Sequence, residues 1–317
     1  MAYNTSITRS DADVLVPEPV AAKIYQGAVE SSVIMSNATR LPNMAAYTER
    51  LPVLNALPLA YFVGEAAPKQ TSTVNWDHVT LQAAEIAVIQ PIPEAVIDDA
   101  NFDIWANVRP LIEQALGVAF DQAVISGVNA PISWPTDIVT AATAAGNVVT
   151  AGTYADLYDD VLSEGGVYSR VEADGYMVTG NVGAIPLMAK VRGTRSVDGV
   201  PLFTQQGAEG STSYYIGGVK TSFPRNGAVS ASDTLMISGD WSQLVYSMRQ
   251  DITYKILTEA TITDNSSPRQ IIFSLGQDDM VAMRVVMRLA WQLPNPVNAV
   301  EPGTRYPFGL LLPTAGY

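Results

Sequence analysis

The chain has 317 residues, 48% of them hydrophobic, which allows one large or two ordinary folded domains with a sizeable core. It has no cysteine, which excludes disulfides and thiolate sites, and its single histidine leaves too few ligands for a usual zinc site. The formal net charge of −13, from 31 acidic and 18 basic residues, argues against tight or sequence-specific nucleic-acid binding.

The chain also lacks the marks of membrane insertion or export. No apolar run approaches the roughly 20 residues that a membrane-spanning helix needs. The polar N-terminus, Met1 to Thr5, does not have the charged and then apolar pattern of a signal peptide. We therefore expect a soluble protein that makes no use of a membrane.

The first 51 residues or so form an N-terminal arm with little core of its own. Pro17 and Pro19 favour an extended lead-in, and Val20 to Met35 has the apolar spacing of a short amphipathic helix. We expect this arm to pack on the body of the protein or on a neighbouring chain.

A long β-hairpin follows the arm. Pro52–Gly64 and Val74–Ile92 are β-prone, and Glu65–Ser72 between them has the proline and small polar residues of a loop. At about 3.3 Å per residue, a dozen residues per arm reach roughly 40 Å. A two-stranded ribbon on its own is only marginally stable in water. Unless it folds back over its own domain, the hairpin must lie on another copy of the chain, which predicts self-assembly.

The clearest helical pattern runs from Asp103 to Ser126, where apolar residues recur every three to four positions. We expect the side chains of Asp98, Asp99 and Asn101 to cap its start and Gly127 to end it. Pro110 removes a backbone donor and crowds the preceding turn. We therefore expect a bend at Pro110, or a helix that becomes regular only from there.

Shorter elements are predicted next along the chain. They are a strand end at Asn147–Thr150, a helix at Tyr154–Val171 capped by Thr153, a buried strand at Tyr176–Thr179, a helix at Pro186–Arg192, a turn at Asp198–Gly199, strand-like segments at Tyr214–Ile216 and Val219, and strands at Thr234–Gly239 and Leu244–Thr261.

The last major element has strict alternation. From Val281 to Leu293 the odd positions are large and apolar, while Arg284 and Arg288 stand at even positions. This pattern predicts a half-buried strand. The prolines between Pro294 and Pro313 then predict an extended tail.

Residues that could carry chemistry have more ordinary interpretations. His78, beside Asp77, is interpreted as a surface polar residue of an exposed strand. The stretch Gly217–Ser222 resembles the end of a phosphate loop but lacks the glycine directly before Lys220. The acidic pairs are interpreted as caps or solvated charge; they are Asp98–Asp99, Asp159–Asp160 and Asp278–Asp279. We accordingly predict no catalytic, cofactor or metal site and no enzyme activity.

The hairpin tip holds the residues that we single out. Lys69 is either a solvated loop lysine or a contact, ionic or covalent, with a neighbouring subunit. Glu65, at the start of the tip, is included in the same predicted intersubunit contact.

Several segments in this order resemble the major capsid proteins of tailed double-stranded-DNA bacteriophages, whose Hong Kong phage capsid fold is shared with encapsulins. The segments are Tyr61–Glu65, Pro91–Asp99, Phe120–Gly127, Gly239–Ser242, and Gln277–Asp279 through Arg284 and Arg288. Together they span nearly the whole chain.

The resemblance implies an α+β capsid fold with a definite domain order. The expected parts are an N-terminal arm (1–52), an extended hairpin loop (53–92), a peripheral domain with a spine helix (93–136), an axial domain (137–240), and a return to the peripheral domain with a C-terminal tail (241–317).

The resemblance also implies a structural function. Subunits would form pentamers and hexamers that close into an icosahedral shell around packaged double-stranded DNA, within a virion assembled in the host cytoplasm. Scaffolding, portal and decoration proteins would be separate partners. Some members join subunits through an isopeptide bond between a loop lysine and an asparagine, helped by a glutamate. Lys69 stands where that lysine would be, but no asparagine or glutamate here is matched to the other two.

Two alternatives remain. One is an encapsulin-like compartment with the same fold and a protein cargo. The other, of a different class, is an acidic soluble hydrolase that uses a carboxylate pair.

Overall fold

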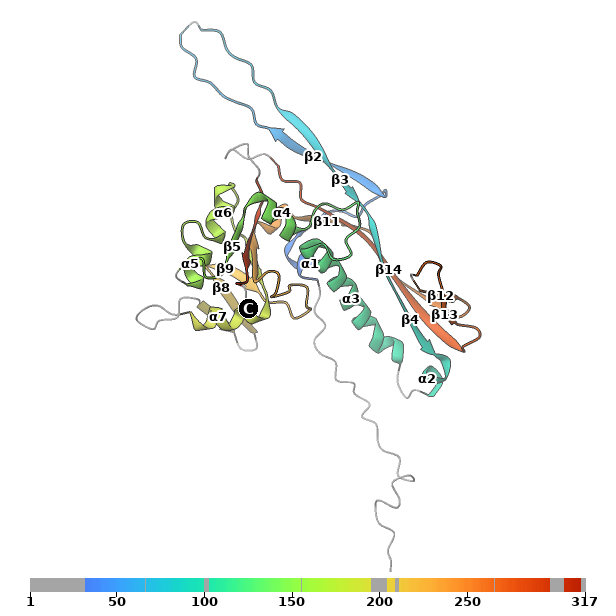
Figure 1. Cartoon of the computed structure of the whole chain (residues 1–317). Helices are drawn as coiled ribbons and strands as arrows, with labels where there is room; N and C mark the ends of the chain where they lie inside the picture. Colours follow the sequence, from blue (N-terminus) through green and yellow to red (C-terminus); the bar gives the residue numbers. More distant parts are fainter. Residues whose placement is uncertain are drawn as a thin grey trace, which may run out of the picture.

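The computed structural model is organised by a long helix, a four-stranded sheet, a seven-stranded sheet and a projecting hairpin (Figure 1). Shorter helices and a small two-stranded sheet complete the fold. The structure describes residues 32–65, 67–99, 103–154, 156–194, 204–208, 211–264, 266–296 and 305–314, with the backbone alone for 204–208 and 211–213. The mixture of helices and sheets confirms the predicted α+β class.

The helices in chain order are α1 (Val33–Asn37), α2 (Glu94–Asp99), α3 (Ile104–Ser126), α4 (Ile138–Ala145), α5 (Leu157–Leu162), α6 (Val167–Ala173), α7 (Ile185–Gly193) and the 3₁₀ turn η1 (Trp241–Gln243). The strands are β1 (Thr39–Arg40), β2 (Thr48–Ala56), β3 (Asn75–Gln82), β4 (Ala84–Pro93), β5 (Val148–Thr150), β6 (Gly180–Gly183), β7 (Thr204–Ala208), β8 (Ser211–Ile216), β9 (Val219–Ser222), β10 (Met236–Gly239), β11 (Val245–Leu257), β12 (Thr261–Thr263), β13 (Ile271–Ser274), β14 (Met280–Gln292) and β15 (Phe308–Leu312).

The predicted long helix is present as α3. Asp103 caps it by accepting a hydrogen bond from the Ala106 backbone amide at 3.1 Å, and Gly127 ends it in the left-handed conformation with φ of 69°. The prediction that Asp98 and Asp99 cap this helix is wrong, because both belong to the separate helix α2, and Asn101 lies outside the described residues. The helix begins at Ile104, six residues before Pro110, so the prediction of a helix that becomes regular only from Pro110 is wrong.

Strand β14 is the centre of the four-stranded sheet, whose order is β1-β11-β14-β4. Its odd positions from Met283 to Trp291 lie in the core that includes Phe120 of α3. At the even positions Arg284 and Arg288 are exposed and Gln292 is half-buried, as predicted, whereas Ala282, Val286 and Ala290 are buried. Ala290 is buried because Met44 and the base of the hairpin, including Leu81, cover it.

The hairpin is shorter than the sequence suggests. Strand β2 pairs with β3 from Thr48 opposite Gln82 to Ala56 opposite Asn75. The predicted return arm, Val74–Ile92, is divided after Gln82, because β4 leaves the hairpin and pairs antiparallel with β14. The divided arm ties the hairpin to the frame of the four-stranded sheet.

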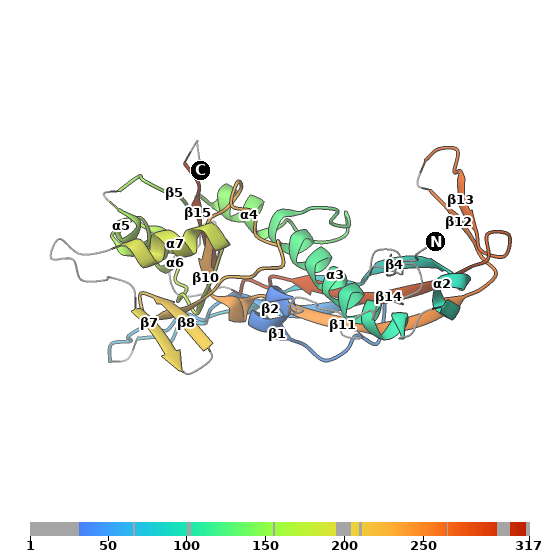
Figure 2. The ribbon, with the colours of Figure 1, turned by 90° about the horizontal axis from the view of Figure 1, so that it is seen from below.

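The C-terminal segment also departs from prediction. The seven-stranded sheet has the order β5-β15-β10-β6-β9-β8-β7, so β15 lies inside it rather than in an extended tail (Figure 2). Phe308, Leu310 and Leu311 are fully buried. The prolines of this segment led to the prediction of an extended tail. The strand was missed because its apolar run of five residues is too short to show a clear period.

Three further predictions are corrected. The helix predicted at Tyr154–Val171 is two helices, broken where Gly165 has φ of 82°, and Asp156 rather than Thr153 caps the first of them. The strand expected at Tyr176–Thr179 begins only at β6. The helix expected at Val20–Met35 lies mostly outside the described residues, and Ser32 is extended and caps α1 instead.

Several other predicted elements are confirmed. They are the strand end at β5, helix α7, the strands β8 and β9, and the strands β10 and β11, with small shifts of their ends. The turn predicted at Asp198–Gly199 lies outside the described residues.

A buried carboxylate, Asp121 of α3, joins three distant parts of the chain. It accepts hydrogen bonds from the hydroxyl of Ser32, from the backbone amides of Val33 (2.8 Å) and Ile34 (3.2 Å), and from the side-chain amide of Asn226 (3.1 Å). The end of the N-terminal arm, the long helix and the loop before β10 therefore meet at one side chain.

Replacing this carboxylate is predicted to destabilise the subunit. Asp121→Ala leaves several buried donors without an acceptor, and each such donor costs about 1–3 kcal/mol. We expect a loss of about 3 kcal/mol or more in the free energy of unfolding, measured by chemical denaturation of unassembled subunits. Asp121→Asn, which keeps the size and one acceptor, should lose less; equal stability of Asp121→Ala and the original chain would contradict the assignment.

The same pair of variants carries a pH signature. Burial raises the pKa of Asp121 above 3.8, against the opposing hydrogen bonds. The folded chain therefore takes up this proton at a higher pH than the unfolded chain does. Relative to Asp121→Asn, the free energy of unfolding of the original chain should rise as the pH falls from the raised pKa toward 3.8. A difference independent of pH over that range would contradict the shift.

Candidate assembly interface

The hairpin projects from the body of the described chain and has many exposed large apolar side chains (Figure 1). Beyond Ala56 and Asn75 the two arms continue without strand pairing. They are held near each other where the backbone amide of Leu59 donates to the hydroxyl of Ser72 at 2.7 Å. The loop at residues 57–74 thus has much of its backbone available for contacts outside the subunit.

Large apolar side chains stand uncovered on this hairpin. Phe62 is 110% exposed, Trp76 70% and Leu59 66%. Tyr61 and Val63 beside them are also exposed. Contiguous exposed apolar surface of this kind marks a site of protein contact, because single scattered apolar residues are the ordinary case on a monomer.

The two tip residues singled out from the sequence are both exposed, Glu65 and Lys69. Neither has an ion pair or hydrogen bond within the described part of the chain. Their side chains are available to a partner, and their contact with a neighbouring subunit stays a prediction.

The other sequence candidates have structural roles. His78 lies exposed on β3, with its Nδ1 3.7 Å from the Asp77 Oδ1, as expected of a surface residue. The stretch Gly217–Ser222 is the tight turn Gly217–Gly218 followed by strand β9, and the next element is the strand β10. It therefore lacks the strand-loop-helix context of a phosphate loop.

The acidic pairs do not combine into one site. Asp160 is buried and accepts hydrogen bonds from the backbone amides of Gly152 (2.7 Å) and Tyr154 (2.9 Å). Asp278 accepts the amide of Ser274 at 2.8 Å. Over the described ranges, no group of three or more His, Cys, Asp or Glu residues could hold a metal ion, and no helix is long and apolar enough to span a bilayer.

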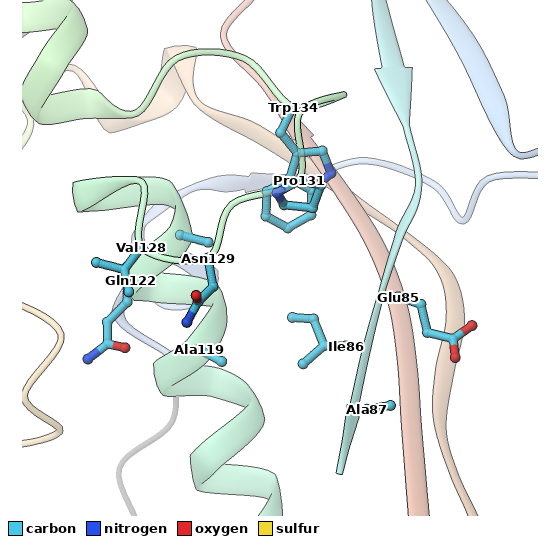
Figure 3. Close-up of a pocket in the computed structure, with 10 residues that line it drawn as sticks. Glu85, Ile86, Ala87, Ala119, Gln122, Val128, Asn129, Pro131 and Trp134 are labelled. Carbon is cyan, nitrogen blue, oxygen red and sulfur yellow. The ribbon is translucent and has the colours of Figure 1, made fainter. Parts of the chain in front are cut away.

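Sequence analysis missed a cavity of about 240 Å³ between β4 and the end of α3 (Figure 3). Ile86 points toward α3 and Glu85 points away from it, while Trp134 and Pro131 close one end (Figure 3). The Trp134 indole donates to the Gln82 carbonyl at 3.1 Å. The cavity is mainly apolar, and β4 and the 128–134 loop come together only in the tertiary structure, so no local signal could have found it.

Comparisons with known proteins agree with this geometry. The model of the phage capsid family matches residues 12–304. The major capsid protein of Staphylococcus phage 80alpha is 23% identical over 279 residues, covering 84% of this chain and 78% of that protein. The probable major capsid protein gp17 of Mycobacterium phage D29 is 24% identical over 277 residues, covering 86% and 85%.

Solved structures extend the similarity to nearly the full length. A chain from Microbacterium phage Oxtober96 is 32% identical with a TM-score of 0.83, covering 98% of this chain and 100% of that one. A chain from Mycobacterium phage Cain is 32% identical with a TM-score of 0.82, covering 99% and 100%. A capsid chain of a native GTA particle, 17% identical with a TM-score of 0.68, shares the fold.

The exposed hairpin is predicted to matter for association and little for folding. Phe62→Asp changes a side chain without cover in its own subunit, so the free energy of unfolding should change by less than about 0.5 kcal/mol. Association should be strongly weakened, because the variant would place an unpaired charge in an apolar contact. Sedimentation velocity measures the association. As a control, Phe120→Asp places a charge in the core and should prevent folding. Unchanged association of Phe62→Asp would contradict the interface.

Proposed function

This chain belongs to the phage capsid family, and from that membership we propose that it is the major capsid protein of a tailed phage, the repeated subunit of its head. The proposal agrees with the resemblance found in the sequence. It is also supported by two phage structures, each of which matches this chain over at least 98% of its length.

The single observation that carries the mechanism is the uncovered hairpin. Apolar residues such as Phe62 and Trp76 gain stability only when another surface removes them from water. A contact between one subunit's hairpin and a different surface of the next is heterologous, and such contacts close into rings when the rotation permits. We propose that these rings are pentamers and hexamers, and that they combine into an icosahedral shell.

We propose roles for the parts of the subunit as well. The hairpin at Thr48–Gln82 would be the extended loop, and α3 would be the spine of the peripheral domain at 93–136. The axial domain would cover 137–240, with the remaining chain returning to the peripheral domain. Strand pairing supports three changes to the division expected from the sequence: residues 48–52 would join the extended loop, β4 the peripheral domain and β15 the axial domain.

The acidic composition supports DNA as the content of the shell. A net charge of −13 makes a poor binding surface for phosphate, so enclosed DNA would be held by confinement instead of by adhesion. The virion is the corresponding location, with assembly in the host cytoplasm and with separate scaffolding, portal and decoration proteins. Membership of the phage family favours this function over an encapsulin-like compartment, and the structural role of the named relatives favours it over a hydrolase.

Electron microscopy of the purified protein tests the proposal. We expect closed shells of uniform size, and particles from infected cells should contain double-stranded DNA that survives nuclease treatment. A protein cargo in place of DNA would favour the compartment. Small particles alone, at concentrations at which family members assemble, would favour the hydrolase and contradict the shell.

Lys69 remains a candidate for covalent joining of subunits. Its side chain is exposed and unpaired among the described residues, as a cross-linking lysine would need to be. If the bond forms, shells boiled in detergent should give ladders on a gel, and Lys69→Met should give monomers. A clean monomer band from the original chain would leave Lys69 with a non-covalent role.

A further inference from the structure

The face of the four-stranded sheet turned away from α3 carries an unusual arrangement of charge. Arg284 and Arg288 stand on this face because the intervening odd positions of β14 pack on the core with α3. Lys255 of β11 lies directly opposite Arg284, and Ile89 of β4 flanks Arg284 on its other side. Lys255, Arg284, Arg288 and Ile89 are all exposed.

The three cations on this face differ in their partners. Arg288 is balanced, since its Nε donates to the Oε2 of Glu85 at 2.7 Å. Lys255 and Arg284 have no carboxylate within 4.0 Å among the residues that the structure describes. Like charges directly opposite in an antiparallel pair destabilise it. In a chain with a net charge of −13, such an uncompensated pair points to a carboxylate from outside the subunit.

The same face offers apolar surface beside the cations. Ile89 is 43% exposed, and Ala87 next to it on the strand face is exposed as well. A partner that fits would therefore present one carboxylate within an apolar segment. The apolar cavity at Ile86 lies on the other side of β4, toward α3, and is a separate feature (Figure 3).

The hairpin loop of a second copy has this chemistry. Between Leu57 and Val74 the only carboxylate is Glu65, and it follows the exposed apolar residues Tyr61 to Val63. The loop cannot reach this face within its own subunit. The hairpin extends from one end of the sheet, while β4 runs from its base in the opposite direction (Figure 1).

We propose that Lys255 and Arg284 receive Glu65 from the hairpin of a second copy, with the apolar part of that loop covering Ile89. The contact removes the repulsion between the two cations and gives the loop a defined position on the neighbouring sheet. It rests on the proposed function, since it requires shells or their precursors to form.

Charge reversal tests the contact. In the original chain, assembly is followed by sedimentation as a function of protein concentration. We expect Lys255→Glu with Arg284→Glu to raise the concentration needed for assembly about tenfold or more, because like charges would then face each other across the interface. Glu65→Lys alone should give a similar loss. Combining all three substitutions should restore assembly to within about threefold of the original chain.

Controls separate this contact from folding and from the general function. Lys255→Arg with Arg284→Lys keeps both charges and should assemble normally. Lys220→Glu reverses the charge of an exposed lysine on strand β9, away from this face, and should also assemble normally. Thermal melting of unassembled variants checks folding. Normal assembly of the reversed variants, or a triple variant as defective as its parents, overturns the contact while the shell stands. An original chain that never assembles overturns the proposed function itself.

Discussion

The organisation of this subunit follows from an apolar hairpin that its own chain cannot cover. The hairpin projects beyond the sheet, and Phe62 and Trp76 are left in water. Burying such side chains is favourable by about 1.5–3 kcal/mol each, and two strands alone give them no core. In the proposed function, association with further copies supplies the missing surface, and the isolated chain is then one part of a larger assembly.

A projecting element can guide assembly only if its base is rigid. Here the frame is β14, with α3 packed on one face and β4 and β11 hydrogen-bonded on either side. Leu81 and Ala290 pack together where the hairpin leaves this frame. Asp121 fixes the end of the N-terminal arm to α3 from the other side. The direction of the hairpin is therefore set by the core, while its surface remains free for neighbours.

Charge contributes to the specificity of assembly, whereas apolar burial contributes to its affinity. The chain has a net charge of −13, which opposes unspecific contact between copies and with DNA. Against this background the exposed pair Lys255 and Arg284 is a local exception that can select one approach of a neighbour. Such an ion pair would fix the orientation of the neighbouring subunit more than it would strengthen the contact, because exposed ion pairs contribute only about 0–1 kcal/mol each.

The sequence by itself determined the elements whose pattern is local. Helix α3 repeats every three to four residues and β14 every two, and each period is set by the backbone geometry of that one segment. Tip residues such as Glu65 could be proposed because an exposed loop is also a local feature. Only the tertiary structure decided that β15 is a buried strand, that β4 leaves the hairpin, and that Lys255 faces Arg284. Those outcomes depend on pairing between segments far apart in the chain, which no local period encodes.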